Sequence, residues 1–470
     1  MFEHQVRAVD KLRRLKVGAL YLEMGTGKTR TALELINIRL NAGKVDHIIW
    51  LCPCSVKTNL KYDIIKHAGE LPGNFTICGI ETLSSSIRAN SELMALVQSK
   101  MCYLIVDESN LVKNHLAQRT KNIIRLAGYC TYKLILNGTP ITRTYQDLFA
   151  QWLVIDWRIF GYKSFWSFSA NHLVYDENNP SRVIRCLNVD YLTEKIAPYS
   201  YQITKAECLT LPDKSYEVVH YDLTRSQYEH YLSVADEFMM EVDDLDPHTV
   251  YRMFAALQNV ISGKRVYNEK HIRSEPYFKN PMDNPRLQVM MEIANGTYDK
   301  MIIYCKYTDE IKIITELLNH RYGPDTAVPF YGELNQKKRQ QNLEKFMGNA
   351  QYLVANKVCA GYGLNLQFCS YVVYYSNDWD YGTRVQSEDR VHRIGQEKNV
   401  HIIDICADNT LDKQIIKCLR RKEDLVDRFK CRLDEVKDKE GLLQWITDGK
   451  RAINGKKKKK CEDLIDAKII

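Results

Sequence analysis

The amino-acid sequence predicts an α/β protein with two parallel-sheet lobes that are joined by a segment of different composition. Short apolar runs alternate with longer amphipathic stretches, as is typical of strands and helices around a buried parallel sheet. Early in the chain such apolar runs occur at 17–22, 47–51, 102–106 and 133–136. They return at 301–305, 352–355, 371–375 and 400–405, with helical spacing at 308–319 and 336–347. Because the pattern occurs twice, we expect two lobes of one kind.

The predicted domain boundaries lie where this pattern stops and returns. We expect a first lobe at 1–156 and a second lobe at 286–425. The segment between them, 157–285, is rich in Tyr, His and charge and has few strand-like runs, which indicates helical insertions and a linker. Residues 426–470 suggest a C-terminal helix and a basic tail. The five lysines at 456–460 are expected either to be solvated or to contact phosphates non-specifically.

Composition limits the possible compartments and partners. The chain has 470 residues, which suits two or three domains, and a net charge of +8, which is compatible with a polyanionic partner. The 14 cysteines are scattered without a C-x-x-C pair, so we expect reduced core thiols rather than a zinc or disulfide site. No apolar run reaches the roughly 18 residues of a membrane span, and polar and charged residues interrupt the first ten residues. We therefore expect a cytoplasmic protein without a membrane partner.

The clearest local signal is the loop at 23–29, Glu-Met-Gly-Thr-Gly-Lys-Thr, here called the phosphate loop. A predicted strand precedes it and a predicted helix at 31–40 follows it, so free N–H groups and the positive helix end face a phosphate. Lys28 suits the β and γ phosphates, and the Thr29 hydroxyl suits Mg²⁺. Leu22 stands where the general motif has its first glycine. The loop predicts binding of ATP with Mg²⁺, with nucleotide contacts from Met24, Gly25, Thr26, Gly27, Lys28 and Thr29.

A pair of carboxylates follows the apolar run at 102–106. A phosphate-loop ATPase needs one carboxylate for Mg²⁺ at the end of a neighbouring strand and a second one to orient the attacking water. Asp107 fits the first role, which it shares with Thr29, and Glu108 fits the second. Without the phosphate loop, such a pair would be interpreted as a solvated turn.

Further motifs occur in a recognisable order along the chain. In the first part they lie at 2–5, 51–53, 81–83, 107–110, 112–114 and 138–140, and in the second part at 331–346, 361–366 and 386–396. The last of these, Gln-Ser-Glu-Asp-Arg-Val-His-Arg-Ile-Gly-Gln, is the most diagnostic. From near Met1 to about residue 425, the chain resembles the SNF2-like branch of the superfamily 2 helicase-type ATPases.

This resemblance implies two RecA-like lobes with ATP between them and roles for particular residues. Gln5 would contact adenine, Gly363 and Gln386 would be further nucleotide contacts, and Pro53, Thr82 and Lys357 would contact nucleic acid. Coupling between ATP and nucleic acid would involve Asn110, Asn137, Gly138 and Thr139.

Two arginines in the last motif are expected to complete catalysis. Arg390 and Arg393 are three residues apart, so we expect them on one face of a helix. From the second lobe they would reach the γ-phosphate and stabilise charge on the transferring phosphoryl group.

Two residues depart from the family pattern. Asn110 stands where the family box ends in His, and Asn137 replaces the usual Thr or Ser. Asn can hydrogen-bond but carries no charge. We expect these two side chains to face each other as a substituted pair, which would affect coupling more than hydrolysis.

The resemblance implies a DNA-dependent ATPase that moves along double-stranded DNA. Two alternatives remain at this point: a strand-separating helicase on DNA or RNA, and a nucleotide-gated clamp on DNA without turnover. The sequence shows no chromatin-reading or zinc module beside the motor, so we expect a compact monomeric motor like those of phages, mobile elements and bacteria. Trp152, Trp157 and Trp166 are expected in the core rather than stacked on bases.

Overall fold

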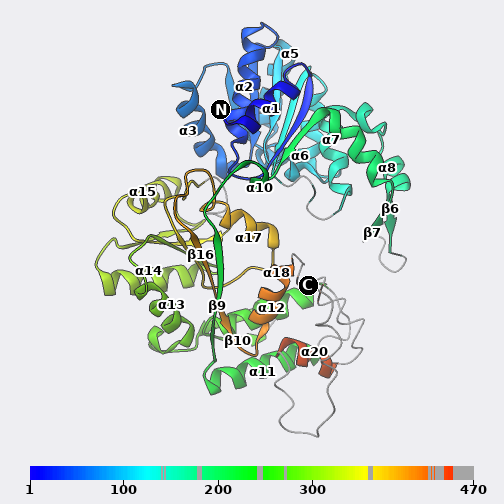
Figure 1. The fold of residues 1–470 in the computed structure, drawn as a ribbon. Helices are drawn as coiled ribbons and strands as arrows, with labels where there is room; N and C mark the ends of the chain where they lie inside the picture. The colour runs from blue at the N-terminus through cyan, green and yellow to red at the C-terminus, as the bar shows by residue number, and fades with distance from the viewer. Residues whose placement is uncertain are drawn as a thin grey trace. The chain divides into compact units, whose positions relative to one another are not determined.

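The computed structural model describes residues 1–138, 141, 144–176, 183–240, 247–268, 272–357, 364–421, 425, 428 and 439–447. The chain forms two compact units (Figure 1). Unit 1 comprises Met1–Pro212 with two later segments, 364–367 and Asp389–Glu397. Unit 2 begins at Asp213 and contains the remaining described residues. The chain thus passes from one unit to the other within the segment 157–285, which was predicted to connect the lobes.

Unit 1 is built around a six-stranded sheet in the order β3-β2-β4-β5-β1-β8. All of its strand pairs are parallel. The strands are β1 (Val17–Leu22), β2 (His47–Cys52), β3 (Phe75–Gly79), β4 (Cys102–Val106), β5 (Tyr132–Asn137) and β8 (Ser200–Ile203). Parallel strands need crossover connections, which explains why a helix follows most of these strands.

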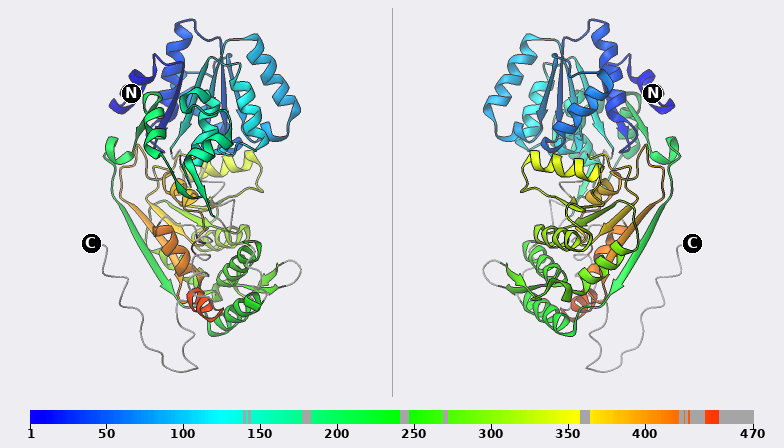
Figure 2. Two further views of the ribbon diagram at one scale, coloured as in Figure 1. Left: turned by 90° about the vertical axis from the view of Figure 1, so that its right-hand side faces the viewer. Right: turned by 90° about the vertical axis from the view of Figure 1, so that its left-hand side faces the viewer.

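Helices flank both faces of this sheet (Figures 1 and 2). On one face, Leu20 and Leu22 of β1 pack with α1 (Glu3–Leu12), α2 (Lys28–Asn41) and α3 (Lys57–Ala68). On the other, Ala19 and Tyr21 pack with α5 (Ile87–Ser99), α6 (Gln118–Ala127) and α7 (Gln146–Phe160). This alternation follows from the two-residue period of a strand, and burial of both faces explains why the strands are apolar throughout.

Smaller elements complete unit 1. The further helices are α4 (Thr82–Ser85), α8 (Phe165–His172), α9 (Val189–Ile196) and α10 (Lys205–Cys208), with short 3-10 turns at Cys54–Val56, Ser109–Val112 and Ala197–Tyr199. An antiparallel pair is formed by β6 (Leu173–Tyr175) and β7 (Val183–Cys186).

Unit 2 has a second six-stranded sheet, in the order β13-β14-β12-β15-β16-β9, again with parallel pairs only. Its strands are β9 (Lys214–Tyr221), β12 (Met301–Cys305), β13 (Ala327–Phe330), β14 (Tyr352–Asn356), β15 (Tyr371–Tyr374) and β16 (Val400–Ala407). The two parallel sheets confirm the predicted fold class.

The helices of unit 2 surround this sheet (Figure 2). They are α11 (Arg225–Met240), α12 (Pro247–Ile261), α13 (Pro285–Asn295), α14 (Thr308–Tyr322), α15 (Gln336–Met347), α17 (Tyr381–Glu388), α18 (Leu411–Arg421) and α20 (Lys439–Ile446). A two-stranded antiparallel pair, β10 (Lys264–Asn268) and β11 (Ile272–Pro276), and a 3-10 turn at Pro281–Asp283 complete it.

The expectation of few strands in 157–285 is wrong, because β8 and β9 each add a sixth strand to a main sheet. Both strands lie at a sheet edge, where one side of the strand has no partner strand. The first three residues after Lys214 in β9 are exposed, so the strand lacks the continuous apolar run that marks the interior strands.

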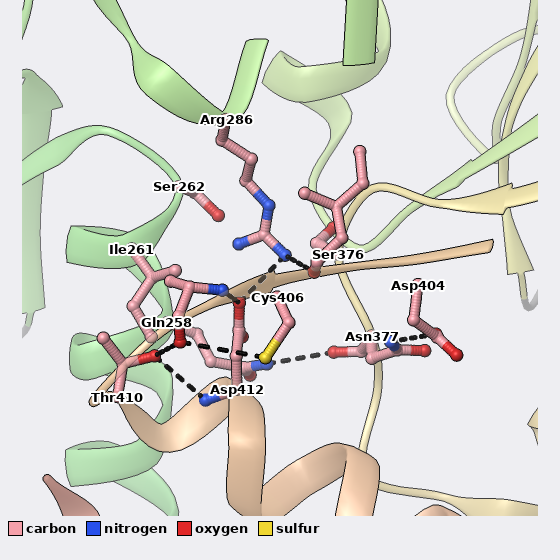
Figure 3. Close-up of polar contacts among 12 residues, drawn as sticks. Gln258, Ile261, Ser262, Arg286, Ser376, Asn377, Asp404, Cys406, Thr410 and Asp412 are labelled. Atoms are coloured by element: carbon pink, nitrogen blue, oxygen red, sulfur yellow. Dashed lines mark hydrogen bonds and ion pairs between the residues drawn. The ribbon is translucent and has the colours of Figure 1, made fainter. Parts of the chain in front are cut away.

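A buried polar network ties several elements of unit 2 together (Figure 3). Arg286 at the start of α13 forms an ion pair with Asp412 of α18 at 3.1 Å and donates to the carbonyl of Ile405. Gln258 of α12 donates to the carbonyl of Asn377 at 2.9 Å. Removing one partner of a buried ion pair leaves an uncompensated charge. The packing of α13 and α18 on β16 therefore depends on this network.

The three tryptophans expected in the core differ in burial. Trp152 is fully buried against the unit 1 sheet, Trp157 is 37% exposed, and Trp166 on α8 is 80% exposed. The core assignment is therefore confirmed for Trp152 and wrong for Trp166. Among the described residues, no helix has the length and apolar character needed to span a membrane.

Candidate active site

The phosphate loop joins β1 to α2 in unit 1, and its conformation depends on two glycines. Gly25 and Gly27 have φ of 81° and 93°, in the left-handed region that favours glycine. α2 begins at Lys28, immediately after the second glycine. The loop therefore places the N-terminal N–H groups of a 14-residue helix beside it, as predicted for a phosphate site.

The first helix holds this loop from one side. Gln5 Nε2 donates to the carbonyl of Thr26 at 3.1 Å, and His4 Nε2 lies 2.8 Å from the same oxygen. Both side chains are buried. A Cβ on Gly27 would lie 2.1 Å from Gln5 Nε2, so a larger residue cannot replace Gly27 without displacing Gln5. The predicted adenine-contact residue is thus packed against the predicted phosphate loop.

Two carboxylates follow β4 beside the loop. Burial raises the pKa of Asp107 to about 7, with a smaller contribution from the Glu108 carboxylate, whereas Lys28 opposes the rise. The Glu108 backbone N–H donates to Asp107 Oδ1 at 2.9 Å, and Glu108 has a φ of 49°. A buried carboxylate next to a second one is an environment that a divalent cation stabilises. Together with the Thr29 hydroxyl, Asp107 offers the oxygen ligands that Mg²⁺ prefers, so these residues fit the predicted metal.

The segment Asp389–Glu397, here called the arginine segment, belongs to unit 1 and lies against the phosphate loop. Arg390 Nη2 lies 3.7 Å from the sulfur of Met24, and a Cβ on Gly25 would lie 2.7 Å from the Cβ of Arg393. Arg393 donates to the carbonyl of Leu364 at 3.4 Å and to Asn365. Burial lowers the pKa of Arg393 to about 10, and the charge of Arg390 adds to this effect.

The expectation that both arginines share a helix face is wrong. α17 ends at Glu388, and the arginine segment continues as turns. Asp389 is bound by Lys205, and Gly395 has a φ of 91°. These interactions replace continued helical hydrogen bonding, yet both arginines still line the same site.

A cavity of about 460 Å³ lies where these parts meet. Its lining includes ten of the predicted site residues: Gln5, Met24, Gly25, Gly27, Lys28, Thr29, Asp107, Glu108, Arg390 and Arg393. The volume falls in the range of small-ligand and cofactor sites. The structure thus brings the predicted phosphate-binding, metal-binding and water-orienting residues to one cavity of unit 1.

Comparisons with known proteins agree with this arrangement. Residues 72–272 match the SNF2-related domain, and residues 285–395 match the helicase conserved C-terminal domain. The chain belongs to the SNF2-like branch of the superfamily 2 helicase-type ATPases. Both matched domains are those of ATP-hydrolysing superfamily 2 enzymes, which confirms the predicted enzyme class.

Among the relatives of this SNF2-like chain are bacterial proteins. An uncharacterized ATP-dependent helicase of Mycoplasma genitalium is 23% identical over 87% of this chain and 40% of its own length. A putative ATP-dependent helicase/translocase of Bacillus subtilis is 23% identical over 72% of this chain and 36% of its own. The chain thus spans about two fifths of the length of these curated relatives.

Among solved structures, the SWI2/SNF2 ATPase core of Sulfolobus solfataricus in complex with double-stranded DNA is similar. It is 20% identical to this chain, with a TM-score of 0.39, and the match covers 95% of this chain and 97% of that one.

Some predicted site residues of the SNF2-like chain lie elsewhere or are not described. Thr26 is buried under the loop and contacts α1 through its carbonyl. Gly138 lies against the loop, since a Cβ there would be 3.5 Å from Lys28 Nζ. Gln386 lies on α17 in unit 2. Gly363 and Thr139 fall outside the described residues.

Sequence reasoning missed one wall of the cavity. Asn59, Asp63, Lys66 and His67 of α3 line it, together with Arg30 of α2. The pKa of Asp63 is raised by burial, which the nearby charge of Arg393 opposes. The spacing of 59, 63, 66 and 67 places these residues on one helix face, so periodicity could have indicated a polar face on α3.

The predicted pairing of Asn110 with Asn137 stays a prediction, since the structure shows no hydrogen bond between these two side chains among the described residues. Asn110 Oδ1 is buried without a hydrogen-bond partner among the residues that the structure describes. Its neighbour Ser109 donates to Gln151 Oε1 of α7 at 2.6 Å. This bond fixes the 3-10 turn after Glu108 on α7, and the turn also contacts β5, the strand that ends at Asn137.

Two of the predicted nucleic-acid contacts lie close together in unit 1. Pro53 follows β2, and Thr82 begins α4 just after β3, the neighbouring strand. Cys54 connects them, because its Sγ lies 3.5 Å from Thr82 Oγ1. Carboxyl ends of adjacent parallel strands meet at one sheet edge, which is where open α/β sheets bind ligands.

Lys357, the third predicted contact, lies at the carboxyl end of β14 in unit 2 with only 2% of its surface exposed. Its Nζ is buried without a hydrogen-bond partner in the described part of the chain. This placement does not support a direct phosphate contact. The pKa of Lys357 is lowered from 10.5 to about 7, mainly by burial; the charges of Arg384 and Lys306 contribute to this shift, and Asp378 and Asp404 oppose it.

We expect Lys357→Met to raise the free energy of unfolding at pH 6 by a few kcal/mol, on the order of the measured cost of burying an ammonium group. Between pH 7 and 10.5 the folded chain has lost this proton while the unfolded chain keeps it. Wild-type stability therefore rises with pH across this window, and the advantage of the variant shrinks. Denaturant unfolding at pH 6 and pH 10 measures both values. An equal gain at both pH values would contradict the buried-charge explanation.

Proposed function

We propose that this chain is a DNA-dependent ATPase that translocates along double-stranded DNA, with Mg²⁺–ATP as its substrate. The observation that carries this proposal is the convergence of Lys28, Asp107, Glu108, Arg390 and Arg393 on one cavity beside a phosphate loop. These are the groups that phosphoryl transfer needs, because its catalysis consists mainly of positioning and charge stabilisation.

The chain's own residues divide this work. N–H groups at the start of α2 and the ammonium of Lys28 hold the phosphates. Glu108 accepts a proton from the attacking water and orients it towards the γ-phosphate. Arg390 and Arg393 stabilise the charge that builds up on the transferring group. Thr29 and Asp107 would hold Mg²⁺, which would supply positive charge for phosphoryl transfer.

DNA as the track is supported by family membership, by the net charge of +8, and by the name helicase/translocase given to a bacterial relative. Pro53 and Thr82 are the proposed contacts on unit 1. Contacts to phosphates make binding independent of sequence and sensitive to salt.

The test measures ATP hydrolysis by the purified protein without nucleic acid and with duplex DNA, single-stranded DNA or RNA. We expect the strongest stimulation with duplex DNA, weakening as salt rises, and its loss in Glu108→Gln. Displacement of a third strand from a triplex then detects movement along the duplex. Stimulation only by single strands, with unwinding of a tailed duplex, would instead indicate a strand-separating helicase. Binding of DNA without any turnover would indicate a clamp.

A further inference from the structure

Lys205 lies beside the active site although no motif of the sequence includes it. It is the first residue of α10 and follows β8, which pairs with β1 in parallel with Ile203 opposite Leu22. This register brings Lys205 level with the start of the phosphate loop. Its backbone N–H donates to Glu23 Oε2 at 2.7 Å, which anchors the lysine to the first residue of the loop.

The ammonium of Lys205 binds the arginine segment at two points. It forms an ion pair with Asp389, in which the two side chains are 8% and 4% exposed. It also donates to the carbonyl of His392 at 3.0 Å. These two acceptors each immediately precede one of the arginines in the sequence, Arg390 and Arg393.

Lys205 Cε also approaches the loop itself, because a Cβ on Gly25 would lie 3.7 Å from it. Contacts therefore run from Glu23 through Lys205 to Asp389 and His392. In an ion pair this deeply buried, loss of the lysine removes a positive charge that stabilises the Asp389 carboxylate. The arginine segment would then have to shift or protonate Asp389, and either change moves the guanidinium groups relative to the loop.

We propose that Lys205 is a positioning residue that fixes Arg390 and Arg393 against the phosphate loop. This inference rests on the proposed function, since it assigns the lysine a part in the same hydrolysis. It acts through the arginines and does not itself contact the phosphates. Its loss should reduce stabilisation of the transition state far more than it reduces nucleotide affinity, because the arginines act on charge that develops during transfer.

The experiment compares the wild type with Lys205→Met, Asp389→Asn and the double variant. We expect each single variant to lower kcat about 100-fold, in line with the cost of a small misplacement of catalytic groups. The affinity for ADP should stay within about threefold, whereas the affinity for ADP with aluminium fluoride, a transition-state mimic, should fall by about the same factor as kcat. The double variant should be no worse than either single one, because both remove the same interaction.

Two further variants separate positioning from folding. Lys205→Arg keeps the charge and should restore most of the lost kcat, and Lys205→Gln, which is one bond shorter, keeps an uncharged donor if the methionine variant unfolds. Lys264→Met removes an ion pair to Asp309 in unit 2 and should leave kcat unchanged. Equal losses of ADP and ADP–aluminium fluoride affinity in Lys205→Met, or a full kcat in that variant, would overturn the inference. A wild type that hydrolyses no ATP under any condition would overturn the proposed function and this inference with it.

Discussion

Replacing Glu108 by Gln should lower ATP turnover by about 10³-fold, the usual contribution of a positioned general base, while nucleotide binding is kept. Glu108 lines the cavity next to Asp107 and is held in a left-handed backbone conformation. Glutamine has the same shape and can still hydrogen-bond to water but cannot accept its proton. Single-turnover hydrolysis, together with equilibrium binding of a fluorescent ATP analogue, separates the two effects.

Glu92→Gln is the matched control, since Glu92 is an exposed partner of Arg88 on α5 and should leave turnover unchanged. The assignment would be wrong if Glu108→Gln kept turnover within about tenfold of the wild type, well below the usual effect of such a base. Asp63, a half-buried carboxylate on the cavity wall, would then be the next candidate for the base.

Replacing Arg393 by Ala should lower kcat by about 10³-fold, as expected for an arginine that stabilises transferring phosphoryl charge. The guanidinium is largely buried in the site, and its lowered pKa reflects the cost of holding charge there beside Arg390. A negative phosphoryl group compensates that cost only as charge develops on it, so the loss should appear in kcat rather than in KM. Steady-state kinetics at saturating duplex DNA measure both.

Arg393→Lys tests whether the forked guanidinium matters beyond its charge, and we expect it to recover only part of the activity. Arg88→Ala, which removes a fully exposed arginine of unit 1, should have no effect on kcat. A rise in KM with kcat unchanged in Arg393→Ala would show that the arginine binds the ground state as strongly as the transition state.

The interior of both sheets could be predicted because strands buried on two faces are apolar throughout. The run at 102–106 and the run at 301–305 coincide with β4 and β12. The edge strand β9 could not be predicted in this way, since it exposes much of its surface and contains polar residues among the apolar ones. The helix expected at Arg390 and Arg393 failed for another reason. The spacing of two residues indicates that they share a helix face only where the helix continues. Here the ion pair of Asp389 with Lys205 stabilises a turn instead.

At the site, the sequence identified groups whose chemistry is tied to local spacing, such as Lys28 and Thr29 after two glycines. It missed Asp63 and Lys205, whose roles depend on distant contacts: the partners Lys205 and Asp389 are 184 residues apart. It also predicted a nucleic-acid contact for Lys357, which is buried in the fold. Whether a particular lysine is buried depends on the packing of the whole sheet, and no local sequence pattern indicates it.

The discontinuous make-up of unit 1 has a consequence for biosynthesis. The sheet and the phosphate loop of unit 1 are complete once Pro212 has been made, but the arginine segment follows only after most of unit 2. At roughly 5–20 residues per second, a ribosome takes about 10–35 s to cover that distance. During this interval the nascent chain has a formed phosphate-binding loop without the two arginines. If the proposed function holds, the incomplete chain can bind a nucleotide as a folding ligand, but it lacks the two arginines needed for efficient hydrolysis until most of unit 2 has been made.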